Sequence, residues 1–295
     1  NRGVAKSDLG DRQGAIEDLN TAIELRSDYG EAFYLRGCAN FTFGNYQVAI
    51  TDYNRCIQLK PDFGPAYYVL GGINATLGNN QEAIENLNKA IEINPTLADA
   101  YELRGGVKIE LGDWTGAIDD LNQAIELQND LGSAYSKRGH AKYMLEDHKG
   151  AIEDYDKSIK LQTEIAMNYY NRGRVKSSLG NKEAAIDDYS QAIQLQPEFS
   201  HAYSDRGREK YSIGNKEGAI DDFNKAIEIE PECVEAFYYR GEIKYELNDK
   251  KGAIEDYTQA IHFKPDFVQA YVDRGIVRYV LGDEQGSIAD FTQAI

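Results

Sequence analysis

A repeat of 34 residues runs through the whole chain and constrains its fold more than any other feature. A glycine recurs at this spacing nine times without an insertion, from Gly3 to Gly275, and a second glycine follows seven residues later in seven copies. The residue thirteen positions after the first glycine is always Ile, from Ile16 to Ile288. A fixed period of 20–50 residues is typical of solenoids, in which each unit packs only against its neighbours. Below, positions are numbered within the unit so that the first glycine is position 8.

Each unit is predicted to contain two helices, which we call helix A and helix B. In the second copy, apolar and small residues follow a helical period over residues 31–43, and Gly44 ends this helix. Position 16 is Asp or Asn in every copy, which is typical of a helix N-cap. Helix B then covers residues 46–58 and stops before Pro61. A glycine inside helix A costs about 1 kcal/mol relative to Ala, so its recurrence at position 8 indicates that helix B approaches too closely for a Cβ atom.

The order of Tyr or Phe, Gly, Gly, Ala, an aromatic residue, Ala and Pro in a 34-residue unit resembles the tetratricopeptide repeat. The resemblance covers the whole chain and is closest to bacterial-type arrays. It implies an all-α, right-handed superhelical α-solenoid of antiparallel helix pairs. We expect a single solenoid over residues 1–295 without internal domain boundaries. Its nine repeats, the first and last incomplete, are residues 1–29, 30–63, 64–97, 98–131, 132–165, 166–199, 200–233, 234–267 and 268–295.

The charge of the chain excludes several classes of function. With 32 basic and 49 acidic residues the net charge is −17. This acidity argues against nucleic acid as a partner, because that affinity comes mainly from Lys and Arg neutralising phosphates. No apolar run approaches the roughly 18 residues of a membrane span. The three cysteines are an odd, sparse set, which favours free thiols in a reducing compartment, and the expected localisation is cytoplasmic.

Two columns of the repeat vary together. Position 7 is Arg in eight copies, and position 23 is Asp in the same eight. The remaining copy has Leu70 and Asn86 at these positions. We therefore hypothesise an ion pair between helices A and B of each repeat, rather than a ladder of cations for an anionic ligand. The predicted pairs are Arg2–Asp18, Arg36–Asp52, Arg104–Asp120, Arg138–Asp154, Arg172–Asp188, Arg206–Asp222, Arg240–Asp256 and Arg274–Asp290.

The resemblance further implies that helix A lines a concave groove for an extended peptide or a partner helix. The exposed positions of helix A are mostly apolar in the N-terminal repeats, locally basic in the middle, and a mixture of tyrosines and acids in the C-terminal repeats. A tyrosine-rich groove suits recognition, although the same side chains could merely be exposed. Because the chain is otherwise acidic, we expect the central basic patch to anchor a partner with an acidic segment. The candidate binding residues are Lys137, His140, Tyr143, Tyr170, Asn171, Arg174, Arg208, Tyr211, Tyr238 and Tyr239. No repeat has the Lys and Asn of the carboxylate clamp, so binding of chaperone C-termini is not predicted.

Catalytic and cofactor motifs are absent from the sequence. It contains no phosphate-binding loop, no nucleophile elbow, no H-E-x-x-H and no C-x-x-C. The four histidines are scattered, and the adjacent aspartates at positions 22 and 23 cannot face each other along a helix. We therefore predict a non-catalytic scaffold for protein–protein interaction, with no cofactor, metal, nucleic acid or membrane partner. The alternative is a regulatory or sensing array that belongs to a larger enzyme or signalling protein. Neither end shows a polar capping helix, so a homo-oligomer formed through the uncapped ends is a further expectation.

Overall fold

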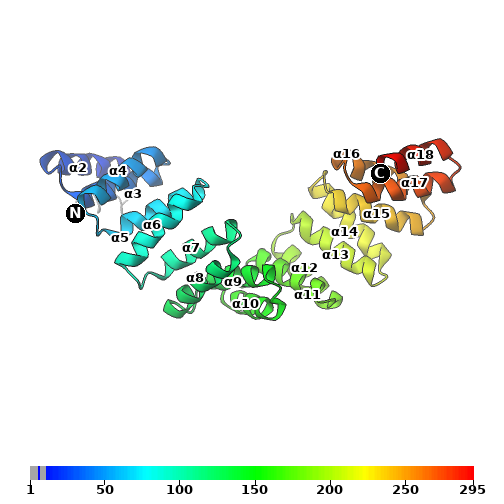
Figure 1. Ribbon diagram of the computed structural model, residues 1–295, viewed down its shortest axis with the longest axis horizontal. Helices are drawn as coiled ribbons and strands as arrows, with labels where there is room; N and C mark the ends of the chain where they lie inside the picture. Colours follow the sequence, from blue (N-terminus) through cyan, green and yellow to red (C-terminus); the bar gives the residue numbers. More distant parts are fainter. Residues whose placement is uncertain (1–5, 7–10) are drawn as a thin grey trace. The chain divides into compact units, whose positions relative to one another are not determined.

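The computed structural model describes residue 6 and residues 11–295, and its regular secondary structure there is entirely α-helical (Figure 1). The helices are α2 (Arg12–Leu25), α3 (Gly30–Thr42), α4 (Tyr46–Leu59), α5 (Gly64–Thr76), α6 (Asn80–Ile93), α7 (Ala98–Glu110), α8 (Trp114–Leu127), α9 (Gly132–Met144), α10 (His148–Leu161), α11 (Ala166–Ser178), α12 (Lys182–Leu195), α13 (Ser200–Ser212), α14 (Lys216–Ile229), α15 (Val234–Glu246), α16 (Lys250–Phe263), α17 (Val268–Val280) and α18 (Glu284–Gln293). Odd-numbered helices are the predicted helices A, and even-numbered ones the helices B.

The helices form two compact units, Asn1–Leu145 and Glu146–Ile295, here called unit 1 and unit 2. Within a repeat, helix A packs along helix B, as α3 does on α4 and α15 on α16. Helix B then packs on helix A of the next repeat, as α12 does on α13. The predicted all-α solenoid of paired antiparallel helices is therefore confirmed, and the predicted bounds in the second repeat are correct to within one residue.

The turn between helices A and B requires a residue in the left-handed backbone conformation, with positive φ, at position 15. Six glycines adopt it, Gly44 with φ of 79° among them. The two repeats that replace this glycine keep the conformation, since Glu146 has φ of 62° and Asn248 has φ of 65°. Residues other than glycine rarely adopt this backbone region. The conformation of the turn is therefore dictated by the packing of the two helices rather than by the residue at position 15.

The N-cap of helix B depends on a second glycine, at position 19. In six described repeats the Asp or Asn at position 16 accepts a hydrogen bond from this glycine's amide, as Asp113 does from Gly116 at 3.0 Å. A Cβ on Gly116 would lie 2.2 Å from Asp113 Oδ2. The repeats with Asn45, Asn79 and Asn181 have Val, Glu or Ala at position 19 and form no such side-chain cap. The cap and the glycine therefore occur together.

The core is a row of alanines and rings between the helices. The alanine at position 20 is fully buried in each described repeat that has one, and the side chain at position 24 packs against the glycine at position 8. A Cβ on Gly37 would lie 2.7 Å from Tyr53 Cε1, and one on Gly71 would lie 2.6 Å from Leu87 Cγ. The expectation that helix B leaves no room for a Cβ at position 8 is confirmed.

Candidate functional site

Six of the eight predicted ion pairs at position 7 are confirmed, those of Arg36, Arg104, Arg172, Arg206, Arg240 and Arg274. In six repeats the guanidinium binds both carboxylate oxygens of the buried aspartate at position 23. Arg172 Nε lies 2.9 Å from Asp188 Oδ2, and Nη2 lies 2.6 Å from Oδ1. Such bidentate pairing is the strong form of a charged hydrogen bond. Arg2 lies outside the described residues.

Each of these arginines also reaches the preceding repeat, a contact for which the sequence pattern gives no signal. Its Nη1 donates to the residue at position 25 of the previous helix B, as Arg36 does to Asn20 at 2.7 Å and Arg274 to Thr258 at 2.9 Å. The basic residue at position 11 forms a second ion pair with the same aspartate, as Lys108 does with Asp120 at 2.9 Å. The position-7 arginines therefore join three helices and are structural.

One repeat lacks this arrangement entirely. Leu70 is buried at position 7, Asn86 replaces the aspartate, and Asn74 replaces the lysine at position 11. Asn86 donates instead to the carbonyl of Glu82 in its own helix at 2.8 Å. A shallow hollow lined in part by Asn54, Asn74 and Asn86 lies where the other repeats place the guanidinium. The junction of α4 with α5 consequently lacks this charged cross-link.

An apolar groove lies on the helix A face of unit 1. It has a volume of about 500 Å³ and is lined by Phe41, Tyr46, Tyr68, Val69, Gly72, Ile73, Thr76, Leu77 and Leu103, from α3, the start of α4, α5 and α7. Phe41, Tyr46 and Leu77 are each at least 40% exposed. Gly72 stands at position 9, where most repeats carry a side chain, and a Cβ there would make only an ordinary 3.5 Å contact with Leu103. The absence of a side chain on Gly72 leaves the groove open.

The three candidate residues in unit 1 lie on α9 and are partly buried. Lys137 Nζ lies 2.6 Å from Glu102 Oε1, a carboxylate of the preceding helix A. His140 packs edge-on against Trp114, with ring centroids 5.8 Å apart. Tyr143 lies one turn further along the same helix. The charge of Lys137 is therefore balanced by a neighbouring carboxylate.

In unit 2 the structure brings Tyr170, Arg174 and Arg208 together in one pocket of about 460 Å³, here called the arginine pocket. Tyr170 donates to Asp205 Oδ2 at 3.0 Å, and Arg208 pairs with Asp205 Oδ1 at 3.1 Å. The guanidinium of Arg174 lies over the Tyr170 ring at 5.9 Å. Burial, followed by the charge of Asp205, raises the pKa of Tyr170. Arg208 thus neutralises the carboxylate beside it.

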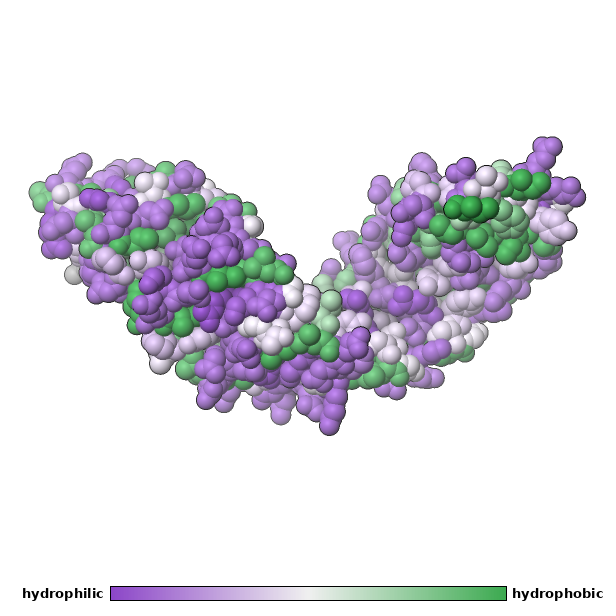
Figure 2. All heavy atoms as spheres, viewed as in Figure 1, coloured by the Kyte–Doolittle hydropathy of each residue, from purple (hydrophilic) through white to green (hydrophobic). Residues whose placement is uncertain are grey.

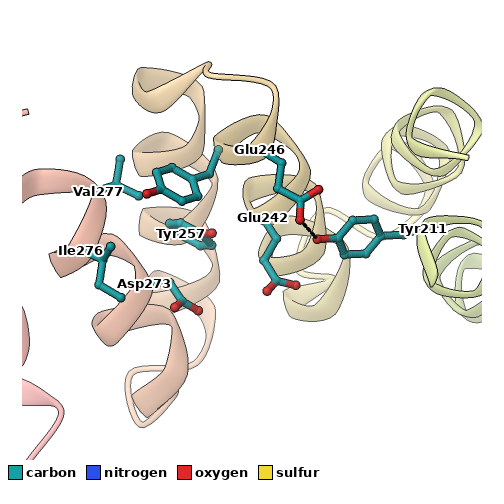
Figure 3. A pocket seen from close by; sticks show the side chains of 8 residues that line it. Tyr211, Glu242, Glu246, Tyr257, Asp273, Ile276 and Val277 are labelled. Atoms are coloured by element: carbon teal, nitrogen blue, oxygen red, sulfur yellow. Dashed lines mark hydrogen bonds between the residues drawn. The ribbon is translucent and has the colours of Figure 1, made fainter. Parts of the chain in front are cut away.

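A second pocket in unit 2, here called the acidic pocket, has a volume of about 240 Å³. It is lined by Tyr211, Glu242, Tyr245, Glu246, Tyr257, Asp273, Ile276 and Val277, from α13, α15, α16 and α17 (Figure 3). Tyr211 donates to Glu246 at 2.9 Å, and Lys216 pairs with Glu246 at 2.9 Å. Glu242 and Asp273 have no basic partner among the residues that the structure describes. Burial, followed by the negative charge of Asp273, raises the pKa of Glu242.

The remaining candidate residues play different parts. Tyr238 is only 9% exposed and donates to Asp273 at 2.8 Å, so it holds a carboxylate that lines the acidic pocket. Tyr239 stacks on Phe223 at 6.1 Å. Asn171 is partly buried on α11 and lines neither pocket of unit 2 described above. Sequence reasoning missed Tyr257, a helix B residue at position 24, because its ring belongs to the core while it also lines the acidic pocket.

The described residues offer few other candidate sites. The described residues contain no group of three or more His, Cys, Asp or Glu side chains arranged to hold a metal ion. None of the helices described above is both long and apolar enough to cross a membrane. Cys38, Cys56 and Cys233 are free thiols, as predicted, and burial raises the pKa of Cys56 to about 11.

The sequence matches the tetratricopeptide repeat over most of its length. The matches cover residues 166–199, residues 75–109 and 105–146, and residues 1–62 and 204–266. The chain therefore belongs to the tetratricopeptide repeat family. Members of this family mediate protein–protein interactions and are typically not catalysts. The comparison with curated protein sequences gives no match.

Solved structures support the same fold. The crystal structure of MamA is 28% identical in sequence with a TM-score of 0.52, covering 55% of this chain and 95% of MamA. YrrB, described as a tetratricopeptide repeat protein with an unusual peptide-binding site, is 24% identical with a TM-score of 0.55, covering 62% of this chain and 95% of YrrB. A tetratricopeptide repeat protein from Parabacteroides merdae is 18% identical with a TM-score of 0.61, covering 86% of this chain and 97% of that protein.

Proposed function

We propose that this chain is a non-catalytic scaffold that binds an extended peptide or a partner helix on its helix A face. The observation that carries the proposal is the apolar groove of unit 1, in which three aromatic side chains surround the open position at Gly72. Exposed apolar surface that is concave and rimmed by polar residues marks binding grooves. The peptide-binding site reported for the similar protein YrrB agrees with this use of the fold.

The experiment selects ligands from a displayed library of random 12-residue peptides and measures their affinity for the purified chain. The blocking variant is Gly72→Gln, which places a long polar side chain in the groove. We expect it to weaken the selected peptides at least tenfold. Both this change and its control remove a glycine from a helix interior, which favours the helix by about 1 kcal/mol, so lost binding would not reflect unfolding.

The matched control is Gly106→Gln, one repeat further along on α7, where a Cβ would lie 3.8 Å from Lys137 Cε and outside the apolar groove. It should leave the affinity unchanged. Equal losses in both variants, or no loss in Gly72→Gln, would show that the groove is not the binding site.

The expectation of an acidic partner segment near Lys137, Arg174 and Arg208 remains a proposal. Two of these cations already have carboxylate partners, Glu102 and Asp205, so a ligand would have to compete with them. If an acidic segment binds there, the affinity should fall with rising salt, because exposed charge pairs are screened. The triple variant Lys137→Glu/Arg174→Glu/Arg208→Glu should then abolish it, with circular dichroism checking that the fold persists.

A further inference from the structure

The arginine pocket and the acidic pocket each lie beside a tyrosine–aspartate pair, and the two pairs are 68 residues apart. Tyr170 and Tyr238 occupy equivalent places, and each donates from its hydroxyl to the aspartate at position 6 of the next helix A, Asp205 or Asp273. The ring of Tyr170 contacts Tyr189 at 5.8 Å and Phe199 at 4.8 Å, and that of Tyr238 contacts Tyr257 at 5.9 Å and Phe267 at 4.9 Å. The two tyrosine–aspartate pairs therefore have the same aromatic surroundings, and three lining positions of the two pockets are equivalent. Asp273 differs from Asp205 in also accepting hydrogen bonds from the uncharged Gln269, at 3.2 and 3.1 Å.

At the equivalent lining positions, the two pockets differ in the cations. Arg174 of the first corresponds to Glu242 of the second, and Arg208 corresponds to Ile276. Where Arg208 pairs with Asp205, Ile276 presents only an aliphatic side chain near Asp273. The acidic pocket thus keeps the carboxylate and loses the guanidinium that balances it, and it gains a second carboxylate from Glu242.

The hydroxyl of Tyr257 in the acidic pocket also lacks a partner. Tyr257 is only 2% exposed, it lines the pocket, and its hydroxyl has no hydrogen-bond partner among the residues described by the structure. Burial, followed by the negative charges of Asp273 and Glu242, raises the pKa of Tyr257. In Figure 3, Tyr257 lies between the helices that carry Glu242 and Asp273. The hydroxyl of Tyr189, the counterpart of Tyr257 in the first site, is fully buried without a partner, whereas the hydroxyl of Tyr257 is not among such atoms. Tyr257 borders the acidic pocket, where a ligand with hydrogen-bond donors can reach its hydroxyl.

We propose that the acidic pocket binds the arginine side chain of a partner peptide, which supplies the guanidinium that Arg208 supplies in the arginine pocket. A guanidinium offers five donors in a planar fork, which suits two carboxylates and a hydroxyl, and it stacks on tyrosine rings such as Tyr211 and Tyr245. The pocket volume of about 240 Å³ is below that of sites for whole small molecules and fits a single side chain. This inference rests on the proposed function, because it assigns one residue of the bound peptide.

The experiment uses fluorescein-labelled nine-residue peptides of Ala and Ser with one central Arg, and measures their affinity for the full chain by fluorescence anisotropy. The comparison peptides carry citrulline or Lys in place of Arg. Citrulline keeps the shape and loses the charge, so we expect at least tenfold weaker binding. Lys should bind with intermediate affinity, because it is a point charge without the fork. Equal binding of the Arg and citrulline peptides, or no measurable binding of the Arg peptide, overturns the proposal.

The decisive variant is Ile276→Arg, which recreates the arginine of the first pocket. Ile276 is 40% exposed, so the substitution should not disturb the fold. The new guanidinium should pair with Asp273 and reduce binding of the Arg peptide at least tenfold, whereas Ile276→Leu should leave it unchanged. Glu242→Gln should also weaken binding. Unchanged affinity in both Ile276→Arg and Glu242→Gln overturns the assignment.

The outcome separates this inference from the proposed function. If peptides selected from the library depend on Gly72 but show no preference for Arg and no response to Ile276→Arg, the scaffold function stands and the arginine site is wrong. If the Arg peptide binds and responds to Ile276→Arg while Gly72→Gln affects no peptide, the acidic pocket stands and the apolar groove is wrong.

Discussion

At the scale of single residues, the position-7 arginine and its aspartate show how this chain pairs a buried carboxylate with a cation. Asp188 is almost fully buried, and three side chains, those of Arg172, Lys176 and Asp156, form one connected network with it. Breaking a buried pair by removing one partner is strongly destabilising because it leaves an uncompensated charge, whereas removing both can be nearly neutral. The repeat with Leu70 and Asn86 already contains the doubly neutral version.

The first prediction is a double-mutant cycle on this pair. Arg172→Leu and Asp188→Asn should each lower the free energy of unfolding by about 2–4 kcal/mol. The double variant should recover most of what either single change loses, so the coupling energy should exceed the loss in either single variant. Urea unfolding followed by circular dichroism measures all four proteins. Simple additivity of the two losses would show that the side chains act independently.

A second prediction concerns the pH dependence contributed by Glu242. Its pKa is raised in the folded chain by burial and by Asp273, so the native state holds this proton at pH values where the unfolded state has released it. Stability therefore falls as the pH rises through the interval between the unfolded and the folded pKa. Glu242→Gln should remove this slope and raise the melting temperature at pH 7. The Gln variant losing stability at pH 7 would contradict the assignment, and Glu235→Gln is a control on the same helix.

At the scale of elements, the beginning of each helix B is fixed by two residues acting together. The cap oxygen at position 16 needs a neighbour without a side chain at position 19, because a Cβ would collide with it. An alanine there has the higher helix propensity, yet the cap itself is worth about 0.5–2 kcal/mol. The two effects oppose each other. Some repeats of this chain have the cap and a glycine at position 19, and others have a residue with a side chain there and no cap.

The third prediction tests that balance. Gly116→Ala should lower the free energy of unfolding by up to about 1 kcal/mol, because the loss of the Asp113 cap, about 0.5–2 kcal/mol, is partly offset by the higher helix propensity of alanine. The reverse change, Ala184→Gly, should be close to neutral, since the cap gained by Asn181 offsets the lower helix propensity of glycine. Thermal unfolding of both variants provides the measurement. Stabilisation by Gly116→Ala would show that the cap hydrogen bond contributes little.

At the scale of the whole molecule, stability is distributed repeat by repeat and junction by junction. Among the described junctions, the one between α4 and α5 has a leucine, Leu70, in place of the shared arginine. The C-terminal end presents apolar surface as well, with Ile288 66% exposed, and Figure 2 shows an apolar patch over the last helices. Association of copies through such ends remains a prediction, which sedimentation at several concentrations would test.

The fourth prediction is that α2 to α4 open separately from the rest of unit 1. Native-state hydrogen exchange should show lower protection for α2, α3 and α4 than for α6, α7 and α8. The paired substitution Leu70→Arg/Asn86→Asp should restore the charged network, with the introduced guanidinium reaching Asn54, and should raise the protection of α4. Leu70→Arg alone should raise it less, because Asn86 offers no carboxylate for the bidentate pair, and the only carboxylates that line the same hollow are those of Glu82 and Glu85. Equal protection across the junction in the unaltered chain would contradict this account.

Much of this architecture could be predicted from the sequence because the repeat supplies nine internal copies. The helix bounds, the left-handed turn, the close approach at position 8 and the Arg–Asp pairs each leave a recurring or covarying column. The site could be predicted only in part. The sequence predicts exposed cations at Lys137 and Arg208. In the structure Glu102 on a neighbouring helix balances Lys137, and Asp205, one turn earlier on the same helix, balances Arg208. Tyr257 was missed because a core position does not reveal that its side chain also lines a pocket.

The sharing of each arginine between two repeats has a mechanical consequence. A chain drawn out from its two termini transmits the load through every junction in series, and a guanidinium held by helices of adjacent repeats must be torn from both before they part. The junction at Leu70 has no such bond to rupture. In a single-molecule pulling experiment we expect the first extension step to release the repeats that precede Leu70. This step should occur at a lower force than steps at junctions that share an arginine, so the leucine at this position would determine where the array first separates.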